Sequence, residues 1–300
     1  MRRLHVLCNP VAGGGRGLRA LDGVRDALRD PAIELRVVRT TSAAHAAEEA
    51  TAAARAGGEV VALGGDGMAR IVAHAIRGSD ATLGVLPGGR GNDLAAVLGL
   101  GRDPVAACAV LREGATRTID VGEADDEHGA RGATFLGVAS IGMESEVTRL
   151  AARAPRIGGR ATYAGAMVVG LIRWRSATFD LRADGVPVRH PGYIAAAANS
   201  GRFGGGMRIA PDAALDDGLL DLVVVEDLPK GRFLRLAPKV FLGTHVARPE
   251  VHVLRAAEVR MDADRPLEVF ADGDPLARTP ATIRVVPGAM RVLAPRRSPV

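Results

Sequence analysis

The sequence predicts an α/β fold, with an N-terminal doubly wound parallel-sheet domain and a C-terminal β-sandwich-type domain. Over residues 1–122, short apolar runs alternate with alanine-rich helical stretches, as in parallel strands joined by helices. After residue 122 the apolar runs become shorter, and turn signals such as Asp184-Gly185 separate some of them. Glycine-rich loops follow three of the N-terminal runs, at the points where a strand gives way to a helix.

Residues 1–122 carry the pattern of the parallel-sheet domain. Apolar runs predict strands at 4–8, 33–39, 59–63 and 83–86. Stretches of helical period predict helices at 18–28, 43–56, 68–77, 92–98 and 104–112. The second of these helices has clear boundaries, because Ser42 is a favourable N-cap and Gly57-Gly58 follows its end.

Residues 123–280 predict a β-rich domain with helical insertions. The acidic, glycine-rich stretch 123–132 is interpreted as a hairpin or a boundary loop. Short runs predict strands at 134–140, 177–182, 192–198, 219–225, 251–254, 258–261 and 267–270. Helical stretches interrupt the strands at 143–153, 160–172 and 231–241. We expect the tail after residue 293 to fray.

The composition allows two domains with aliphatic cores. The chain has 300 residues, of which 47% are apolar and 3% aromatic, and it carries a net charge of +5. Apart from Lys230 and Lys239, its basic residues are arginines. A basic surface suits a nucleotide, an anionic membrane or a nucleic acid. The sequence has no basic stripe interleaved with aromatic residues, which argues against a nucleic-acid partner.

Cysteine use and hydropathy indicate a soluble or peripheral protein of the cytosol. Cys8 lies in a predicted strand and Cys108 in a predicted helix, so we expect both to be buried, reduced thiols. The first apolar run is too short for a secretion signal. The most apolar helical stretch, 161–172, is too short to span a bilayer and is followed by Arg173 and Arg175.

The run Gly64-Gly65-Asp66-Gly67 follows the apolar segment 59–63 and predicts a phosphate site. Glycines let a phosphate approach main-chain N–H groups with no Cβ in the way. The aspartate adds a carboxylate that can hold Mg²⁺ directly or through water. The alternative is a glycine-rich surface turn, which remains open for any short motif.

Two similar loops support the phosphate site. The run 9–17, Asn-Pro-Val-Ala-Gly-Gly-Gly-Arg-Gly, follows the first predicted strand, and 87–93, Pro-Gly-Gly-Arg-Gly-Asn-Asp, follows the fourth. The first run lacks the ending of a P-loop, and the acidic residue of a dinucleotide fingerprint is missing. Because open α/β sheets bind ligands at the carboxyl ends of their strands, we expect the three loops to converge there.

The order and spacing of these motifs resemble the diacylglycerol kinase catalytic family. This family includes bacterial lipid kinases and sphingosine kinases and is distantly related to NAD kinases. Later segments extend the resemblance over nearly the whole chain: Asp120-Val121-Gly122, 135–142, 197–206, 210–221 and 271–274. The resemblance also implies that the run 281–293 returns to the first domain.

The resemblance implies a site for ATP and a catalytic Mg²⁺. The positions that match nucleotide contacts in the family are Asn9, Gly13, Thr40, Gly65, Asp66, Gly67 and Gly89. The acidic positions that resemble the network around the catalytic Mg²⁺ are Asp66, Asp93 and Asp120. From the residues alone, each glycine is equally a turn residue, and Asp93 is equally a charge that balances a helix dipole.

The resemblance places the catalytic base in the segment Asp272-Gly273-Asp274. The family carries its proton acceptor in an Asp-Gly-Glu segment at this point, and Asp274 replaces the glutamate. Either Asp272 or Asp274 is therefore implied as the base that deprotonates the acceptor hydroxyl. From the residues alone, Asp-Gly is the strongest short signal for a hairpin turn, so a purely structural role stays open.

A second, structural Mg²⁺ is implied near Leu215-Asp216-Asp217-Gly218-Leu219. In the family, a carboxylate at the position of Asp217 and main-chain carbonyls at those of Ala214 and Leu219 bind this ion. A solvated acidic turn explains the same segment equally well.

Several positions depart from the family pattern. Met68 replaces the threonine that usually follows Gly-Gly-Asp-Gly, and Arg70-Ile71 replaces an Asn-Glu pair. Arg90 replaces the threonine of the third loop, where its guanidinium can grip phosphate oxygens in a bidentate manner. These changes are compatible with altered nucleotide handling or with the loss of kinase activity.

We expect an ATP- and Mg²⁺-dependent lipid kinase with the nucleotide between its two domains. It would transfer the γ-phosphoryl group to the hydroxyl of diacylglycerol or a related lipid alcohol. One alternative is an NAD kinase-like enzyme, which shares Gly-Gly-Asp-Gly, although the later Asp-Gly segments favour the lipid branch. Another is a non-catalytic nucleotide or lipid sensor that kept the fold.

A lipid acceptor implies peripheral contact with an anionic membrane at its inner face. The apolar stretch 160–172, with Arg173 and Arg175 beside it, is a candidate for lipid entry or membrane contact. The alternative interpretation of this stretch is a helix that packs in the protein core. No nucleic-acid partner is expected, and a homodimer is one alternative for the oligomeric state.

Overall fold

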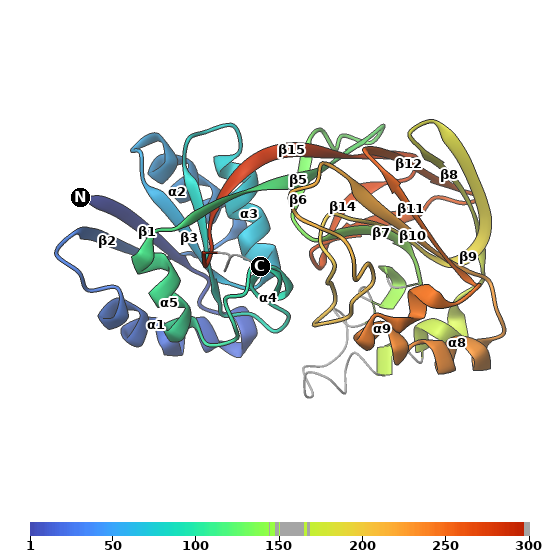
Figure 1. Ribbon diagram of the computed structural model, residues 1–300, viewed down its shortest axis with the longest axis horizontal. Helices are drawn as coiled ribbons and strands as arrows, with labels where there is room; N and C mark the ends of the chain where they lie inside the picture. The colour runs from blue at the N-terminus through green and yellow to red at the C-terminus, as the bar shows by residue number, and fades with distance from the viewer. Residues whose placement is uncertain (144, 148–149, 151–164, 167–168, 297–300) are drawn as a thin grey trace. The chain divides into compact units, whose positions relative to one another are not determined.

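The computed structural model describes residues 1–143, 145–147, 150, 165–166 and 169–296. The chain divides into two compact units, Met1–Val121 with Pro287–Val300 and Gly122–Val286 (Figure 1). Two strands, β5 (Thr116–Asp126) and β15 (Ala281–Leu293), each contribute residues to both units.

A parallel sheet forms the centre of the first unit. Its strands are β1 (Arg2–Cys8), β2 (Ile33–Arg39), β3 (Glu59–Gly64) and β4 (Thr82–Pro87), in the order β2-β1-β3-β4. The end of β15 adds another parallel strand beside β4 through Arg291 and Val292. β3 and β4 are almost entirely buried, which explains why they appear in the sequence as continuous apolar runs.

Helices cover both faces of this sheet. They are α1 (Arg16–Ala27), α2 (Ala43–Arg55), α3 (Asp66–Ile76), α4 (Asp93–Val97) and α5 (Pro104–Glu113). α1 packs against α5, and α2 packs against α3 (Figure 1). The predicted cap of α2 is confirmed, because Ser42 Oγ accepts a hydrogen bond of 3.0 Å from the N–H of His45. This alternation confirms the doubly wound α/β fold.

The second unit consists mainly of antiparallel strands. They are β6 (Ala133–Phe135), β7 (Val138–Gly142), β8 (Ala177–Ala183), β9 (Val186–Ala198), β10 (Leu220–Glu226), β11 (Val251–Ala256), β12 (Glu258–Ala263), β13 (Glu268–Ala271) and β14 (Asp274–Arg278). β9 belongs to two groups of strands. Its first half pairs with β8, which continues through β12 to β15. Its second half pairs with β7 and β10, and this arrangement confirms the predicted sandwich-like fold.

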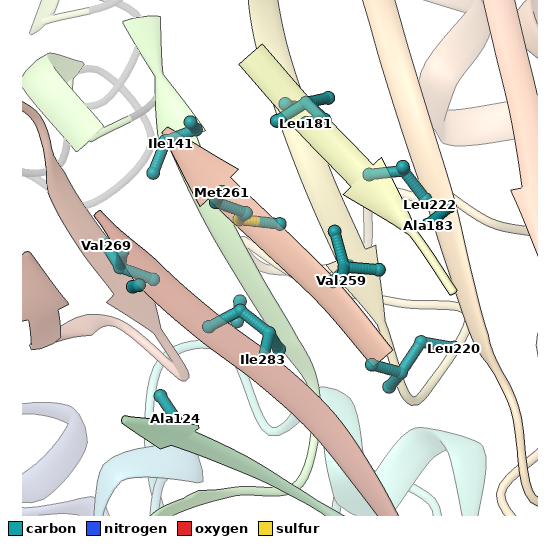
Figure 2. Close-up of a cluster of buried hydrophobic side chains, with 14 of the residues drawn as sticks. Ala124, Ile141, Leu181, Ala183, Leu220, Leu222, Val259, Met261, Val269 and Ile283 are labelled. Carbon is teal, nitrogen blue, oxygen red and sulfur yellow. The ribbon is translucent and has the colours of Figure 1, made fainter. Parts of the chain in front are cut away.

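Two apolar clusters pack against opposite faces of β9. Ala195 and Ala197 belong to a cluster with side chains of β8, β10, β12, β13 and β15, shown in Figure 2. Ala196 and Ala198 belong to a second cluster, which includes Phe233. Successive side chains of a strand point to opposite faces, so a strand that is buried on both faces must be apolar throughout.

Some elements differ from the sequence prediction. The strand predicted at 134–140 is interrupted at Leu136 and Gly137 and forms β6 and β7. The helix predicted at 231–241 forms two short helices, α8 (Lys230–Leu236) and α9 (Lys239–Leu242). Pro238 lies between them, and a proline has no N–H with which to continue a helix. β5 extends into the stretch predicted as a hairpin or boundary loop.

Two predicted helices are only partly covered by the structure. The helices predicted at 143–153 and 160–172 lie largely outside the described residues, and so does the end of the tail, 297–300. Residues 169–173 are described and are helical. In the described part of the chain, no helix has both the length and the apolar character that a membrane crossing requires.

Cys8 and Cys108 are both buried and not disulfide-bonded. Burial, with a smaller contribution from Asp103, raises the pKa of the Cys108 thiol to about 12, and burial also raises the pKa of Cys8. Because the thiolate is the reactive form, we expect neither thiol to react with a thiol-specific dye at neutral pH until the protein is unfolded. Fast labelling of the folded protein would contradict these buried positions.

Candidate nucleotide and catalytic sites

The three glycine-rich loops of the first unit meet at the carboxyl ends of β1, β3 and β4. The N–H of Asn9, after β1, donates a hydrogen bond of 3.1 Å to the carbonyl oxygen of Leu63. The N–H of Gly88, after β4, donates one of 2.7 Å to the carbonyl oxygen of Gly64. The structure therefore brings the three loops together at the edge where open α/β sheets bind ligands.

Glycine is required where these loops touch. A Cβ on Gly89 would lie 2.3 Å from the Cα of Gly65, which is closer than non-bonded carbon atoms approach. A Cβ on Gly13 would lie 2.4 Å from the carbonyl oxygen of Gly88, and the φ of Gly13 is 57°. α1 and α3 both begin beside these glycines with no side-chain cap, so their first N–H groups have no partner within the helix. Such N–H groups are suited to bind phosphate.

Asn92 and Arg16 hold the third loop in place, a role that was predicted from the sequence for neither residue. Asn92 Oδ1 accepts a hydrogen bond of 2.7 Å from the N–H of Gly89, and Asn92 Nδ2 donates one of 3.0 Å to the carbonyl oxygen of Gly89. Arg16 Nη1 donates to the same carbonyl oxygen at 3.2 Å. The φ of Asn92 is 55°, in the left-handed region that asparagine tolerates better than most residues.

Asn9 and Thr40 lie at the ends of β1 and β2. Asn9 Oδ1 accepts a hydrogen bond of 3.1 Å from the N–H of Val11, which closes a local turn. The Thr40 hydroxyl is buried and donates a hydrogen bond of 3.2 Å to the carbonyl oxygen of Cys8, at the end of β1. Both side chains thus support the main chain of the first loop. Gly67 is the second residue of α3, and Arg90 is exposed in the third loop.

Three aspartates of the first unit are the residues predicted from the resemblance to surround a catalytic Mg²⁺. Asp66 begins α3, and its Oδ1 accepts a hydrogen bond of 3.0 Å from the N–H of Leu94, which ties α3 to α4. Asp93 begins α4 and is only 7% exposed. Asp120 lies in β5, is 3% exposed, and accepts a hydrogen bond of 2.7 Å from the N–H of Gly288.

These aspartates fit a magnesium ion by their chemistry. Mg²⁺ prefers carboxylate oxygens and usually takes one or two of them together with phosphate and water oxygens. In the described residues, Asp66, Asp93 and Asp120 do not place one carboxylate oxygen each within 4.8 Å of the others, so they do not form a ready three-ligand cage. Two of them, Asp93 and Asp120, are buried carboxylates.

Asp272 and Gly273 form a tight hairpin between β13 and β14. Ala271 pairs with Asp274 across the turn, and the two central residues have φ values of 52° and 92°. Positive φ at both central residues is the requirement of a type I′ turn, and Asp-Gly is a favoured pair for it. Asp274 is the first residue of β14 and is half-buried.

The Asp272 carboxylate is bound to the main chain at the interruption between β6 and β7. Its Oδ2 accepts a hydrogen bond of 2.8 Å from the N–H of Leu136, and its Oδ1 accepts one of 2.9 Å from the N–H of Gly137. Asn199 Nδ2 donates to the carbonyl oxygen of Leu136 at 3.1 Å. The orientation of the Asp272 carboxylate is therefore fixed by groups from a distant part of the chain.

The Asp217 carboxylate, predicted as a ligand of the structural Mg²⁺, has protein partners in this structure. Its Oδ1 accepts a hydrogen bond of 3.1 Å from the N–H of Leu219, and its Oδ2 pairs with Arg255. Burial raises the pKa of the nearby Asp221, and Arg255 partly offsets this shift. A cation bound by Asp217, with the carbonyls of Ala214 and Leu219, would therefore share this carboxylate with Arg255 or displace it.

Comparisons with known proteins agree with this arrangement. Residues 3–124 match the diacylglycerol kinase catalytic domain, and residues 137–294 match the YegS C-terminal NAD kinase beta sandwich-like domain. A diacylglycerol kinase of Mycobacterium tuberculosis is 36% identical over 298 residues, which cover 98% of this chain and 96% of that protein. The chain belongs to the diacylglycerol kinase family. It is a lipid kinase.

A second relative and a solved structure are similar to this lipid kinase over nearly its whole length. A probable lipid kinase, YegS-like, of Pseudomonas aeruginosa is 33% identical over 309 aligned positions, covering 99% of this chain and 95% of the relative. The crystal structure of a diacylglycerol kinase from Bacillus anthracis shares the fold, with a TM-score of 0.72 and 19% identity, and covers 98% of this chain and 97% of its own.

One departure from the family pattern, the replacement of a threonine by Met68, is explained by packing in this lipid kinase. Met68, which replaces a threonine, is 5% exposed and lies on the buried side of α3. A Cβ on Gly64 would lie 2.7 Å from the Cβ of Met68, so the methionine packs directly on the end of β3. Met68 thus contributes to the core beneath the loop and offers no hydroxyl to a nucleotide.

Proposed function

We propose that this lipid kinase uses ATP and Mg²⁺ to phosphorylate the hydroxyl of diacylglycerol or a related lipid alcohol. The observation that carries the proposal is the convergence of three glycine-rich loops, packed main chain on main chain, at one edge of the parallel sheet. Phosphoryl transfer depends mostly on positioning and on charge stabilisation, which such a set of loops can supply.

The first unit would bind the nucleotide phosphates. The uncapped starts of α1 and α3 offer N–H groups beside Gly13, Gly65, Gly67 and Gly89. Asn9 and Thr40 would shape the first loop, through their hydrogen bonds to its main chain. Arg90 is exposed on the third loop, where a guanidinium can replace the missing hydroxyl contact with a bidentate grip on phosphate.

Asp66, Asp93 and Asp120 are the residues that would hold the catalytic Mg²⁺ or its water ligands. When bound, Mg²⁺ neutralises the charge that develops on the transferring phosphoryl group. Asp66 is the residue best placed for this role, because it follows the second glycine loop directly and starts α3. We also propose the second ion at Asp217, Ala214 and Leu219, where it would share the Asp217 carboxylate with Arg255 or displace it.

Asp272 is the catalytic base that we propose, with Asp274 as the alternative. Two main-chain N–H groups, those of Leu136 and Gly137, fix the orientation of the Asp272 carboxylate. Fixed orientation is what a general base needs to accept a proton efficiently. An Asp-Gly turn is compatible with a catalytic base and with a purely structural aspartate. Comparing kcat of aspartate-to-asparagine variants tests which role Asp272 has.

A panel of acceptors tests the substrate. We would measure label transfer from ATP to diacylglycerol, ceramide, sphingosine, a polyprenol and phosphatidylglycerol in mixed micelles, with NAD as a soluble acceptor. We expect Mg²⁺-dependent product from diacylglycerol or a close relative. Product from NAD alone would identify the NAD kinase-like alternative. Nucleotide binding with no product from any acceptor would identify the non-catalytic sensor.

We also propose that the second unit contacts an anionic membrane through α8, α9 and the neighbouring helical residues 169–173. Large apolar side chains are exposed there: Ile172 by 66%, Leu234 by 48%, Phe241 by 54% and Leu242 by 71%. Basic residues occur in or next to the same segments, namely Lys230, Lys239, Arg173, Arg175 and Arg235. Lys230 Nζ also donates to the carbonyl oxygen of Ile172 at 2.7 Å, which joins the two parts of the surface.

Replacing Phe241 and Leu242 with glutamate is expected to weaken vesicle binding. Burial of each side chain contributes about 1.5–3 kcal/mol, so their loss should lower affinity for phosphatidylglycerol vesicles by at least about tenfold. Val186→Glu is a matched control, because Val186 is 62% exposed in β9, outside this surface. Unchanged sedimentation of the double variant with vesicles would contradict this contact.

A further inference from the structure

Two histidines and a glutamate meet at the surface of the second unit, and none of them is among the residues proposed above for nucleotide binding and catalysis. His190 Nδ1 lies 3.1 Å from Glu226 Oε1, and His252 Nε2 lies 2.7 Å from the same oxygen. The two imidazole rings are stacked, with centroids 4.7 Å apart and an interplanar angle of 15°. In the described part of the chain, this is the one group of three such side chains whose ligand atoms all lie within 4.8 Å of one another.

Three neighbouring strands supply this cluster. β10 pairs with β9 on one side and with β11 on the other. His252 lies opposite Val224, and Glu226, two residues further along β10, falls on the same face. The register of β9 and β10 shifts at Val225 and Glu226, which sets Glu226 opposite Gly192, two residues from His190. Because the three residues are far apart in the sequence, only the sheet register brings them together.

The spacing of the cluster suits a transition-metal ion. A zinc ion takes histidine nitrogens at about 2.0–2.1 Å and carboxylate oxygens at about 2.0–2.2 Å, so tetrahedral ligands lie about 3.3 Å apart. The 3.1 Å contact is already close to this separation, and the 2.7 Å contact needs to open by roughly half an ångström. This change is within the reach of a side-chain rotation on a fixed sheet.

The exposure of the cluster leaves room for an ion and its remaining ligands. The side chains of His190, Glu226 and His252 are 31%, 34% and 36% exposed. The ion would therefore be reached from solvent and would complete its coordination with water. Imidazole nitrogens favour zinc, nickel, copper and iron, whereas Mg²⁺ prefers oxygen ligands alone. The donor set thus separates this cluster from any magnesium site of the kinase.

We propose that His190, Glu226 and His252 form a binding site for a divalent transition-metal ion of the zinc class, with three protein ligands and at least one water. A bound ion would link β9, β10 and β11, and it would stabilise the folded second unit by mass action. This proposal does not depend on the lipid acceptor or on the identity of the catalytic base.

Calorimetric titration of the full, untagged chain with zinc chloride tests the proposal. We expect one tightly bound ion per chain, a rise in the thermal midpoint of unfolding, and no competition from excess Mg²⁺. Cobalt should bind at the same place and give the visible absorption of a protein-bound ion with nitrogen ligands. Binding should weaken as the pH falls, because the histidines must be neutral to coordinate a metal.

Two variants make the result decisive. His190→Gln/His252→Gln should reduce zinc affinity by at least about 100-fold, because it removes both nitrogen ligands. His45→Gln is the matched control, since His45 lies on α2 of the first unit beside Glu49, and its loss should leave the affinity unchanged. Absence of zinc binding by the unaltered protein, or equal affinity in the double variant, would overturn the proposal.

Discussion

Replacing Gly89 with alanine is expected to weaken ATP binding severely while the protein still folds. The new Cβ would lie 2.3 Å from the Cα of Gly65, so the second and third loops must move apart. Overpacking of this kind costs about 1–3 kcal/mol of stability. The displaced loops would no longer direct their N–H groups at one phosphate chain, so we expect ATP affinity to fall at least about tenfold. Calorimetric titration with ATP and Mg²⁺ measures the affinity, and thermal unfolding measures the stability.

Two glycines provide controls for this variant. A Cβ on Gly231, in α8, would meet no atom within 4 Å, so Gly231→Ala should leave ATP affinity unchanged. A Cβ on Gly14 would also meet nothing, but the φ of Gly14 is 69°, so Gly14→Ala isolates the effect of backbone strain in the first loop. If Gly89→Ala binds ATP as tightly as the unaltered protein, the loops do not form the phosphate site.

Replacing Asp272 with asparagine is expected to lower kcat by about 10²–10⁴-fold, the range that a positioned general base contributes. Asparagine tolerates the left-handed backbone of Asp272, so the hairpin should keep its shape. Its amide nitrogen replaces one carboxylate oxygen and cannot accept a hydrogen bond, so one of the N–H groups of Leu136 and Gly137 loses its acceptor, which should lower stability by about 1–3 kcal/mol. ATP affinity should remain unchanged.

Asp184 offers an unusually close control for Asp272. It also precedes a glycine in a hairpin, has a φ of 46°, and accepts main-chain hydrogen bonds from Ala257 at 3.0 Å and Glu258 at 2.9 Å. Asp184→Asn should therefore lose similar stability without a comparable loss of kcat. If the two variants behave alike, Asp272 is a structural anchor. A large loss of kcat in Asp274→Asn alone would then assign the base to Asp274.

The parallel sheet of the first unit could be predicted closely from the sequence. β3 and β4 are buried on both faces, so they leave continuous apolar runs that cannot be mistaken for loops. The start of α2 could be predicted because the side chain of Ser42 caps the first turn of this helix. β5 was harder to predict, because polar residues such as Asp120 and Glu123 interrupt its apolar pattern. The sheet supplies partners for these polar groups, and the sequence does not show those partners.

The residues of the candidate site could be predicted from the sequence, but most of the contacts between them could not. The glycine loops are visible in the sequence, but the packing of Gly89 on Gly65 depends on the order of strands. The two hydrogen bonds between Asn92 and Gly89 could have been predicted from the position of this asparagine just before a helix. Asparagine favours both turns and left-handed backbone. The pairing of Asp217 with Arg255 joins residues from separate strands and loops, and nothing local indicates it.

The most direct test of a lipid kinase with these roles is the time course of label transfer from ATP to diacylglycerol in mixed micelles, with and without Mg²⁺. We predict that the unaltered protein forms labelled phosphatidic acid only with Mg²⁺, that Asp184→Asn does so at a similar rate, and that Gly89→Ala and Asp272→Asn do so far more slowly. Product formation at equal rates by all four proteins would contradict both the nucleotide site and the catalytic base.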